Sequence, residues 1–140
     1  MKSGTASLFL TLLLMTILTA CISAPSRIQL ASPWLDSDAL TRLFRDHTVE
    51  SVNVKSGVVS RTYYAPDGSL VQWREGTWRN GRWRVRNGRI CLQMEDRREK
   101  CRAVIKEDGQ YRKYVIRRDG RHRLVVTYRW FEPGNRLRQP

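Results

Sequence analysis

Residues 78–92 read WRNGRWRVRNGRICL, and this run carries the clearest signal for the fold class. It holds two Asn-Gly pairs, at 80–81 and 87–88, and Asn-Gly tolerates the positive φ angles of two-residue hairpin turns. Apolar and basic residues alternate around the pairs, as they do on strands with one buried face. If both pairs are turns, Trp78 faces Trp83 across one hairpin and Val85 faces Ile90 across the next. The run therefore predicts antiparallel strands joined by tight turns.

The same register separates apolar from basic side chains. The predicted core face carries Trp78, Trp83, Val85, Ile90, Leu92 and Met94. Cys91 and five arginines fall on the opposite face, and Arg74 extends it. Clustered guanidinium groups repel one another unless an anion or a carboxylate lies near, and they suit phosphate or carboxylate ligands. The face is either an anion-binding surface or the solvated outside of a basic protein, and its candidate residues are Arg74, Arg79, Arg82, Arg84, Arg86 and Arg89.

Similar turn signals recur along the rest of the chain, at Asp67-Gly68, Asp108-Gly109 and Asp119-Gly120. Strands are expected near 48–54, 57–64, 69–78, 82–86, 89–94, 101–106, 111–117 and 122–130. The predicted fold class is mainly β: an antiparallel meander of about eight strands that forms a small barrel or a curled sheet. One short N-terminal helix is expected at about 37–45. Asp36 caps it, and Leu40 and Phe44 lie on its apolar stripe.

The first twenty residues have the features of an export signal. Lys2 precedes an apolar run, 8–18, that is too short to span a bilayer, and Leu18-Thr19-Ala20-Cys21 follows. Here the chain resembles bacterial lipoprotein precursors. The resemblance implies a signal peptide at 1–20, a lipidated Cys21, and a membrane partner through the lipid anchor. Because Ile22 follows Cys21, it also implies the outer membrane, facing the periplasm.

These features predict a simple domain organisation. The lipidated cysteine and a flexible tether occupy 21–33, where Pro25 and Pro33 discourage regular structure. A single β domain is expected at 34–134, and a loose tail at 135–140.

With Cys21 lipidated, Cys91 and Cys101 remain. In an oxidising compartment such a pair is usually a disulfide, here across the polar loop 95–100. The alternatives are a metal site or a redox pair, but the chain has no Cys-x-x-Cys motif and no histidine near either cysteine.

A second, looser resemblance covers the β domain. Small exported proteobacterial β-domains of unknown function share a Tyr-x-x-Asp-Gly turn followed by Gly-x-Trp and two cysteines. The matching positions are Tyr64-Ala65-Pro66-Asp67-Gly68, Gly76-Thr77-Trp78, Cys91 and Cys101. This resemblance implies no activity.

The net charge of the 140 residues is +13, and Lys2 is the only charged side chain of the signal, so the rest carries +12. Such a charge attracts anionic partners. His47 and His122 lie in unrelated contexts and no catalytic motif, metal spacing or phosphate loop occurs, so we expect no enzyme, catalytic residue, metal or cofactor. Export makes a nucleic-acid partner unexpected.

The sequence thus predicts a non-enzymatic envelope lipoprotein. Its basic sheet face would bind an anionic lipid, a glycan or an acidic envelope protein. One alternative is a small-barrel carrier of an apolar ligand. Another is an inhibitor or accessory subunit of an envelope enzyme.

The tryptophans have two interpretations, a stacking platform for sugars or lipids, or part of the core; Trp78 and Trp83 are assigned to the core.

Overall fold

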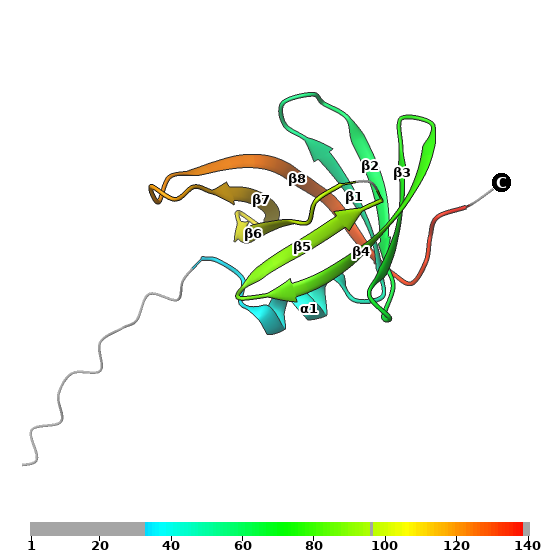
Figure 1. Cartoon of the computed structure of the whole chain (residues 1–140), viewed down its shortest axis with the longest axis horizontal. Coiled ribbons are helices and arrows are strands. Elements are labelled where there is room, and N and C mark those ends of the chain that lie inside the picture. The colour runs from blue at the N-terminus through cyan, green and yellow to red at the C-terminus, as the bar shows by residue number, and fades with distance from the viewer. Residues whose placement is uncertain (1–32, 96, 139–140) are drawn as a thin grey trace, which may run out of the picture. The chain divides into compact units, whose positions relative to one another are not determined.

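The computed structural model describes residues 33–95 and 97–138. The predictions for the signal peptide, Cys21 and most of the tether lie outside these residues. The chain forms one helix and eight strands in a simple up-and-down order (Figure 1). Their bounds are α1 (Ser37–Phe44), β1 (His47–Asn53), β2 (Val59–Tyr64), β3 (Ser69–Arg74), β4 (Thr77–Arg86), β5 (Arg89–Met94), β6 (Lys100–Glu107), β7 (Gln110–Ile116) and β8 (His122–Pro133).

The eight strands close into a barrel. Each strand pairs antiparallel with the next along the chain, and β8 pairs with β1. The predicted mainly-β meander of eight strands is therefore confirmed, and of its two forms the barrel is the one that forms. All eight strands and the core lie between residues 35 and 138, so this part of the chain has a complete strand ladder and a core of its own.

Helix α1 lies across one end of the barrel (Figure 1). The Asp36 carboxylate accepts a hydrogen bond of 2.7 Å from the Ala39 N–H, which is the predicted N-cap. Leu40 and Phe44 are fully buried. The Phe44 ring packs edge-on against the rings of Tyr64 and Tyr128. The remaining core residues at this end are Val49, Leu70, Trp83, Ile90 and Val104. The helix thus supplies two of the apolar side chains that fill this half of the barrel.

The predicted turn at Asn80-Gly81 is wrong. Strand β4 runs straight through it, and the hairpin between β3 and β4 turns instead at Glu75 and Gly76, with φ of 49° and 76°. A Cβ atom on Gly81 would lie 2.5 Å from the carbonyl oxygen of Gln93 on β5. Glycine occurs here because two backbones approach closely. The predicted turn at Asn87-Gly88 is confirmed, since Val85 pairs with Ile90 and Trp83 with Leu92.

Because β4 does not turn at Asn80-Gly81, Trp78 and Arg79 lie on the sides of the sheet opposite to those predicted. Side chains alternate along a continuous strand, so Arg79 shares the interior side of β4 with Trp83. Trp78 lies on the outer side and pairs with Trp73 of β3, contrary to its assignment to the core. Trp83 is a core residue, as predicted.

The segment 135–138, predicted to be a loose tail, has no regular secondary structure but is held by hydrogen bonds. The Thr48 hydroxyl donates to the Gly134 carbonyl and accepts from the Arg136 N–H, at 2.7 and 2.8 Å. No helix in the described part of the chain is long and apolar enough to cross a membrane.

Candidate functional site

The end of the barrel opposite α1 holds a cavity of about 330 Å³. Its lining comes from the strand ends farthest from the helix, such as Asn53 at the end of β1 and Met94 at the end of β5. We call this cavity the barrel mouth. Leu92, Val115, Val125, Val126 and Gln72 also line it, together with eight basic residues: Arg74, Arg79, Arg97, Arg98, Lys100, Arg102, Lys113 and Arg123.

No carboxylate among the described residues lines the barrel mouth. Arg74 pairs at 3.2 Å with Glu75, whose side chain is exposed on the neighbouring turn. In residues 33–95 and 97–138, this is the one ion pair that involves a basic residue of the mouth. The mouth is therefore a concentrated positive site with little compensation from the fold.

Lys113 carries its charge into the barrel interior. It lies on β7 between Val104 of β6 and Val126 of β8, and its ammonium lies 5.5 Å from the centre of the buried Tyr128 ring. Burial and the charge of Arg102 lower the pKa of Lys113 to about 8. The pKa of Arg102 is itself lowered by burial and by Arg123. Desolvation and like-charge repulsion thus both disfavour the charged mouth, and a bound anion would relieve the repulsion.

Tyr128, whose ring lies beside the Lys113 ammonium, is also unusual. The residue is only 3% exposed, and its hydroxyl is buried without a hydrogen-bond partner among the described residues. Buried hydroxyls are normally paired, because an unpaired one costs about 1–3 kcal/mol. The barrel interior therefore holds a polar group that the described fold does not use.

The single arginine face predicted from the sequence does not form. Arg74 and Arg79 belong to the mouth, whereas Arg82, Arg84, Arg86 and Arg89 lie on the outer wall of β4 and β5. For Arg79 the prediction failed because it placed a turn at Asn80-Gly81, whereas on the continuous strand Arg79 shares the side of Trp83.

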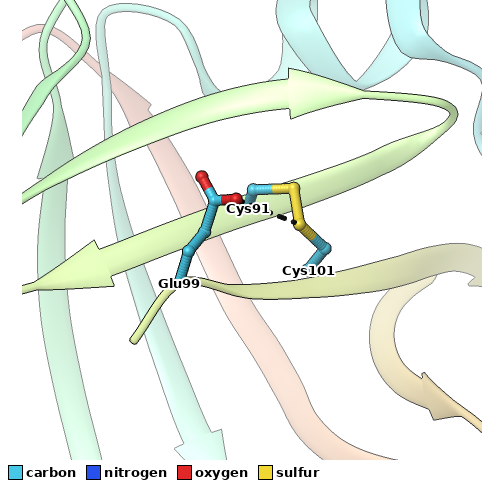
Figure 2. Close-up of side chains that lie close together, drawn as sticks. All are labelled: Cys91, Glu99 and Cys101. Carbon is cyan, nitrogen blue, oxygen red and sulfur yellow. Dashed lines mark hydrogen bonds between the residues drawn. A yellow bond between two sulfur atoms is a disulfide. The ribbon is translucent and has the colours of Figure 1, made fainter. Parts of the chain in front are cut away.

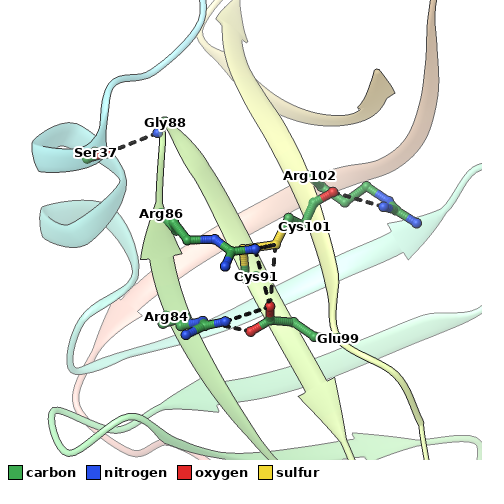
Figure 3. The surroundings of a disulfide bond; sticks show 8 residues. All are labelled: Ser37, Arg84, Arg86, Gly88, Cys91, Glu99, Cys101 and Arg102. Atoms are coloured by element: carbon green, nitrogen blue, oxygen red, sulfur yellow. Dashed lines mark hydrogen bonds and ion pairs between the residues drawn. A yellow bond between two sulfur atoms is a disulfide. The ribbon is translucent and has the colours of Figure 1, made fainter. Parts of the chain in front are cut away.

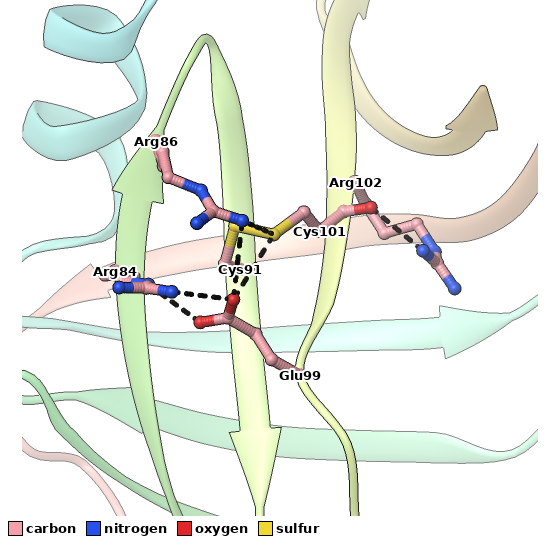
Figure 4. Close-up of polar contacts among 6 residues, drawn as sticks. All are labelled: Arg84, Arg86, Cys91, Glu99, Cys101 and Arg102. Carbon is pink, nitrogen blue, oxygen red and sulfur yellow. Dashed lines mark hydrogen bonds and ion pairs between the residues drawn. A yellow bond between two sulfur atoms is a disulfide. The ribbon is translucent and has the colours of Figure 1, made fainter.

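The outer arginines are interspersed with acids. Arg84 donates two hydrogen bonds to Glu99, of 2.7 and 2.9 Å, and Arg86 lies 3.7 Å from the same carboxylate (Figure 4). Arg102 extends away from this group. Near Arg82, hydrogen bonds from Ser69 and the arginine's charge lower the pKa of Asp67. The outer wall is therefore partly neutralised, and the mouth is the stronger candidate for binding an anion.

The disulfide lies beside these outer arginines. Cys91 and Cys101 are directly opposite each other on β5 and β6 and are joined through their sulfur atoms (Figure 3). The Glu99 carboxylate lies 3.8 Å from the Cys101 sulfur (Figure 2). These three side chains offer donor atoms that suit a metal ion. However, both sulfurs are used in the disulfide and Glu99 is bound by arginine, so the trio has no free set of ligands.

Six basic residues of the mouth are not among the anion-binding candidates named from the sequence. They are Arg97, Arg98, Lys100, Arg102, Lys113 and Arg123. A signal was present for Lys113, since it alternates in step with Tyr111 and Val115 on one strand and so shares their side. The convergence of these six residues with Arg79 had no local signal in the sequence, because it depends on the closure of the barrel.

Comparison with known proteins found no matching family model, no matching curated protein and no matching solved structure. The functional argument therefore rests on the chemistry of the site.

Proposed function

We propose that this protein is a non-enzymatic binding protein of the bacterial cell envelope, and that its barrel mouth takes a small anionic group. The observation that carries the proposal is the convergence of eight basic residues on one cavity that no described carboxylate lines. Arginine and lysine are the side chains that hold phosphate and carboxylate groups in proteins. Eight-stranded barrels commonly have room for one small ligand.

The proposed location follows from the lipoprotein resemblance. A lipidated Cys21 with a tether of about a dozen residues would keep the domain within roughly 40 Å of its membrane. The ligand would then be an anionic component within reach of the periplasmic face of the outer membrane, such as a lipid phosphate, an acidic glycan or an acidic protein. The disulfide fits an exported protein.

An anion is a better candidate than a purely apolar ligand. The apolar half of the barrel is filled by Phe44, Leu40 and the residues around them. The remaining cavity places its apolar side chains beside eight cations. An apolar molecule in the mouth would desolvate those cations without compensating them, which is unfavourable.

The proposal is tested by titration calorimetry of the domain 34–140 with pyrophosphate. R79Q/R102Q removes two charges from the mouth, and R84Q/R86Q removes two from the outer wall as a matched control. We expect saturable binding by the wild type and the control, and at least roughly tenfold weaker binding by the mouth variant, because hydrogen bonds to charged groups contribute about 1.5–3 kcal/mol. Equal affinities in all three proteins, or no binding at low salt, would contradict the proposal.

A further inference from the structure

A row of large side chains crosses the outer wall of the barrel. Trp130 of β8 pairs with Glu50 of β1, and Glu50 pairs with Arg61 of β2. Arg61 pairs in turn with Trp73 of β3, and Trp73 with Trp78 of β4. Residues paired in this way lie next to each other on one face of a sheet. Three tryptophans, a glutamate and an arginine therefore form a continuous strip across five neighbouring strands.

The single acid of this strip is fully engaged. Glu50 is 6% exposed and accepts hydrogen bonds from Arg61 at 2.8 Å and Arg129 at 3.3 Å. Although burial alone would raise the pKa of Glu50, the two arginines hold it below its usual value. Arg61 also lies 5.9 Å from the centre of the Trp130 ring. Two arginines thus share one carboxylate, so Glu50, Arg61 and Arg129 together keep one net positive charge.

The C-terminal segment turns part of this strip into a groove. The Arg136 N–H is anchored on the Thr48 hydroxyl of β1, which fixes the segment beside the sheet. A cavity of about 430 Å³ lies between them. We call it the Trp–Arg groove; its lining residues are Arg61, Trp73, Trp78, Arg136, Leu137 and Arg138.

The side chains of the groove can donate hydrogen bonds but cannot accept them. Arginine guanidinium and tryptophan indole groups are donors only, and leucine is neither donor nor acceptor. A sugar or a peptide would bring hydroxyl or amide donors that these side chains cannot satisfy. The rings of Trp73 and Trp78 are also tilted by 47°, so they do not form a flat platform for stacking a sugar. The groove therefore fits a ligand that is rich in acceptors, negatively charged and partly apolar.

We propose that the Trp–Arg groove docks the domain on an anionic phospholipid bilayer by holding a lipid phosphate. Such a phosphate is an acceptor-only anion attached to apolar chains, which matches the arginines and the apolar groups of the groove. Tryptophan favours the level of the lipid headgroups, because there its apolar ring contacts the acyl chains while its N–H group reaches water. Arg136 and Arg138 are exposed, and no carboxylate among the described residues pairs with them.

The test is co-sedimentation of the domain 34–140 with vesicles of phosphatidylglycerol and phosphatidylcholine in equal parts. R136Q/R138Q removes two exposed charges of the groove, and R84Q/R86Q again serves as the control of equal charge. We expect the wild type and R84Q/R86Q to bind the vesicles, and R136Q/R138Q to bind at least roughly tenfold more weakly. Vesicle binding should also shift the tryptophan fluorescence of the wild type to the blue. W73A/W78A, checked for folding by circular dichroism, should lose both vesicle binding and this shift.

Several results would overturn this proposal. They are equal binding to pure phosphatidylcholine vesicles, equal losses in R136Q/R138Q and R84Q/R86Q, and full competition by soluble glycerol phosphate, which would make a free phosphate the ligand. Loss of vesicle binding in R79Q/R102Q with none in R136Q/R138Q would place the lipid in the barrel mouth instead. The two sites are distinct, so failure here leaves the anion proposal for the mouth standing.

Discussion

Lys113 shows at the scale of one residue how the barrel interior tolerates charge. Its ammonium is held among apolar strand residues, close to Arg102, and its pKa falls to about 8. In the unfolded chain the pKa of a lysine is about 10.4. Below pH 8 the residue is charged in both states, and burial then costs stability. As pH rises from about 8 to about 10.5 the folded state releases the proton first, so stability rises.

This predicts that K113M is more stable than the wild type at pH 7, by on the order of 2–3 kcal/mol. The difference should shrink as pH rises toward 10, where lysine loses its charge in the wild type. Urea unfolding of both proteins at pH 7, 8.5 and 10 measures it. A difference that stays constant with pH would show that Lys113 is not desolvated.

Gly81 is the second residue with a specific role. Its missing Cβ allows the close approach of β4 to Gln93 of β5. We expect G81A to lower the free energy of unfolding by about 1–3 kcal/mol, because the added methyl group meets backbone rather than a mobile side chain. N80A, one position earlier on the exposed side of the same strand, is the control and should change stability little. Chemical denaturation compares the two, and equal effects would contradict this role for Gly81.

The same dipeptide explains the main failure of the sequence prediction. Asn-Gly favours a tight turn, but glycine is also required where two strands approach closely. An Asn-Gly pair in the sequence is therefore compatible with either structure. The turn at Glu75-Gly76 has a residue with positive φ that is neither Asn nor Asp, so the usual signal was missing. Residue identity alone could not separate these cases, because the deciding contact with Gln93 comes from another strand.

At the scale of elements, the disulfide between Cys91 and Cys101 closes the β5–β6 hairpin. Fewer residues pair between β5 and β6 than between β4 and β5, so the covalent link supports a short ladder. We expect C91A/C101A to reduce the free energy of unfolding by roughly 2–3 kcal/mol, as loop-closure entropy predicts for a ten-residue separation. Adding reductant should destabilise the wild type similarly and leave the variant unchanged. A wild type that reductant does not destabilise would contradict the assignment.

Elements that depend on local pattern were predicted well. The apolar stripe and Asp36 cap were enough for α1, and alternation located the strands from β5 to β8 to within a few residues. The boundary between β3 and β4 was predicted wrongly, since it depended on whether Glu75-Gly76 or Asn80-Gly81 forms the turn. The ion pairs of Glu99 with Arg84 and Arg86 also had no local signal, because they join separate strands.

At the scale of the whole molecule, the barrel has two different halves. The half under α1 is apolar and tightly filled, and the other half is a cationic mouth. The sequence indicated an excess of positive charge but not where it would concentrate, because Arg79, Arg102, Lys113 and Arg123 come from four strands. Only closure of the sheet brings them together.

A mouth of this kind should make stability depend on the type of anion. We expect pyrophosphate to raise the midpoint temperature of unfolding more than sodium chloride at the same ionic strength, because a bound ligand stabilises the folded state. The gain should be reduced in R79Q/R102Q and kept in R84Q/R86Q. Scanning calorimetry measures this, and an identical response to both salts would indicate screening alone.

The most direct test of the proposed anion site is a nuclear magnetic resonance titration of the ¹⁵N-labelled domain 34–140 with pyrophosphate. We expect the backbone amides of Arg79, Arg102, Lys113 and Arg123 to shift together and to saturate with one affinity. The amides of Arg84, Arg86 and Glu99 on the outer wall should stay nearly unchanged. Shifts confined to the outer wall, or shifts that never saturate, would contradict an anion site in the barrel mouth.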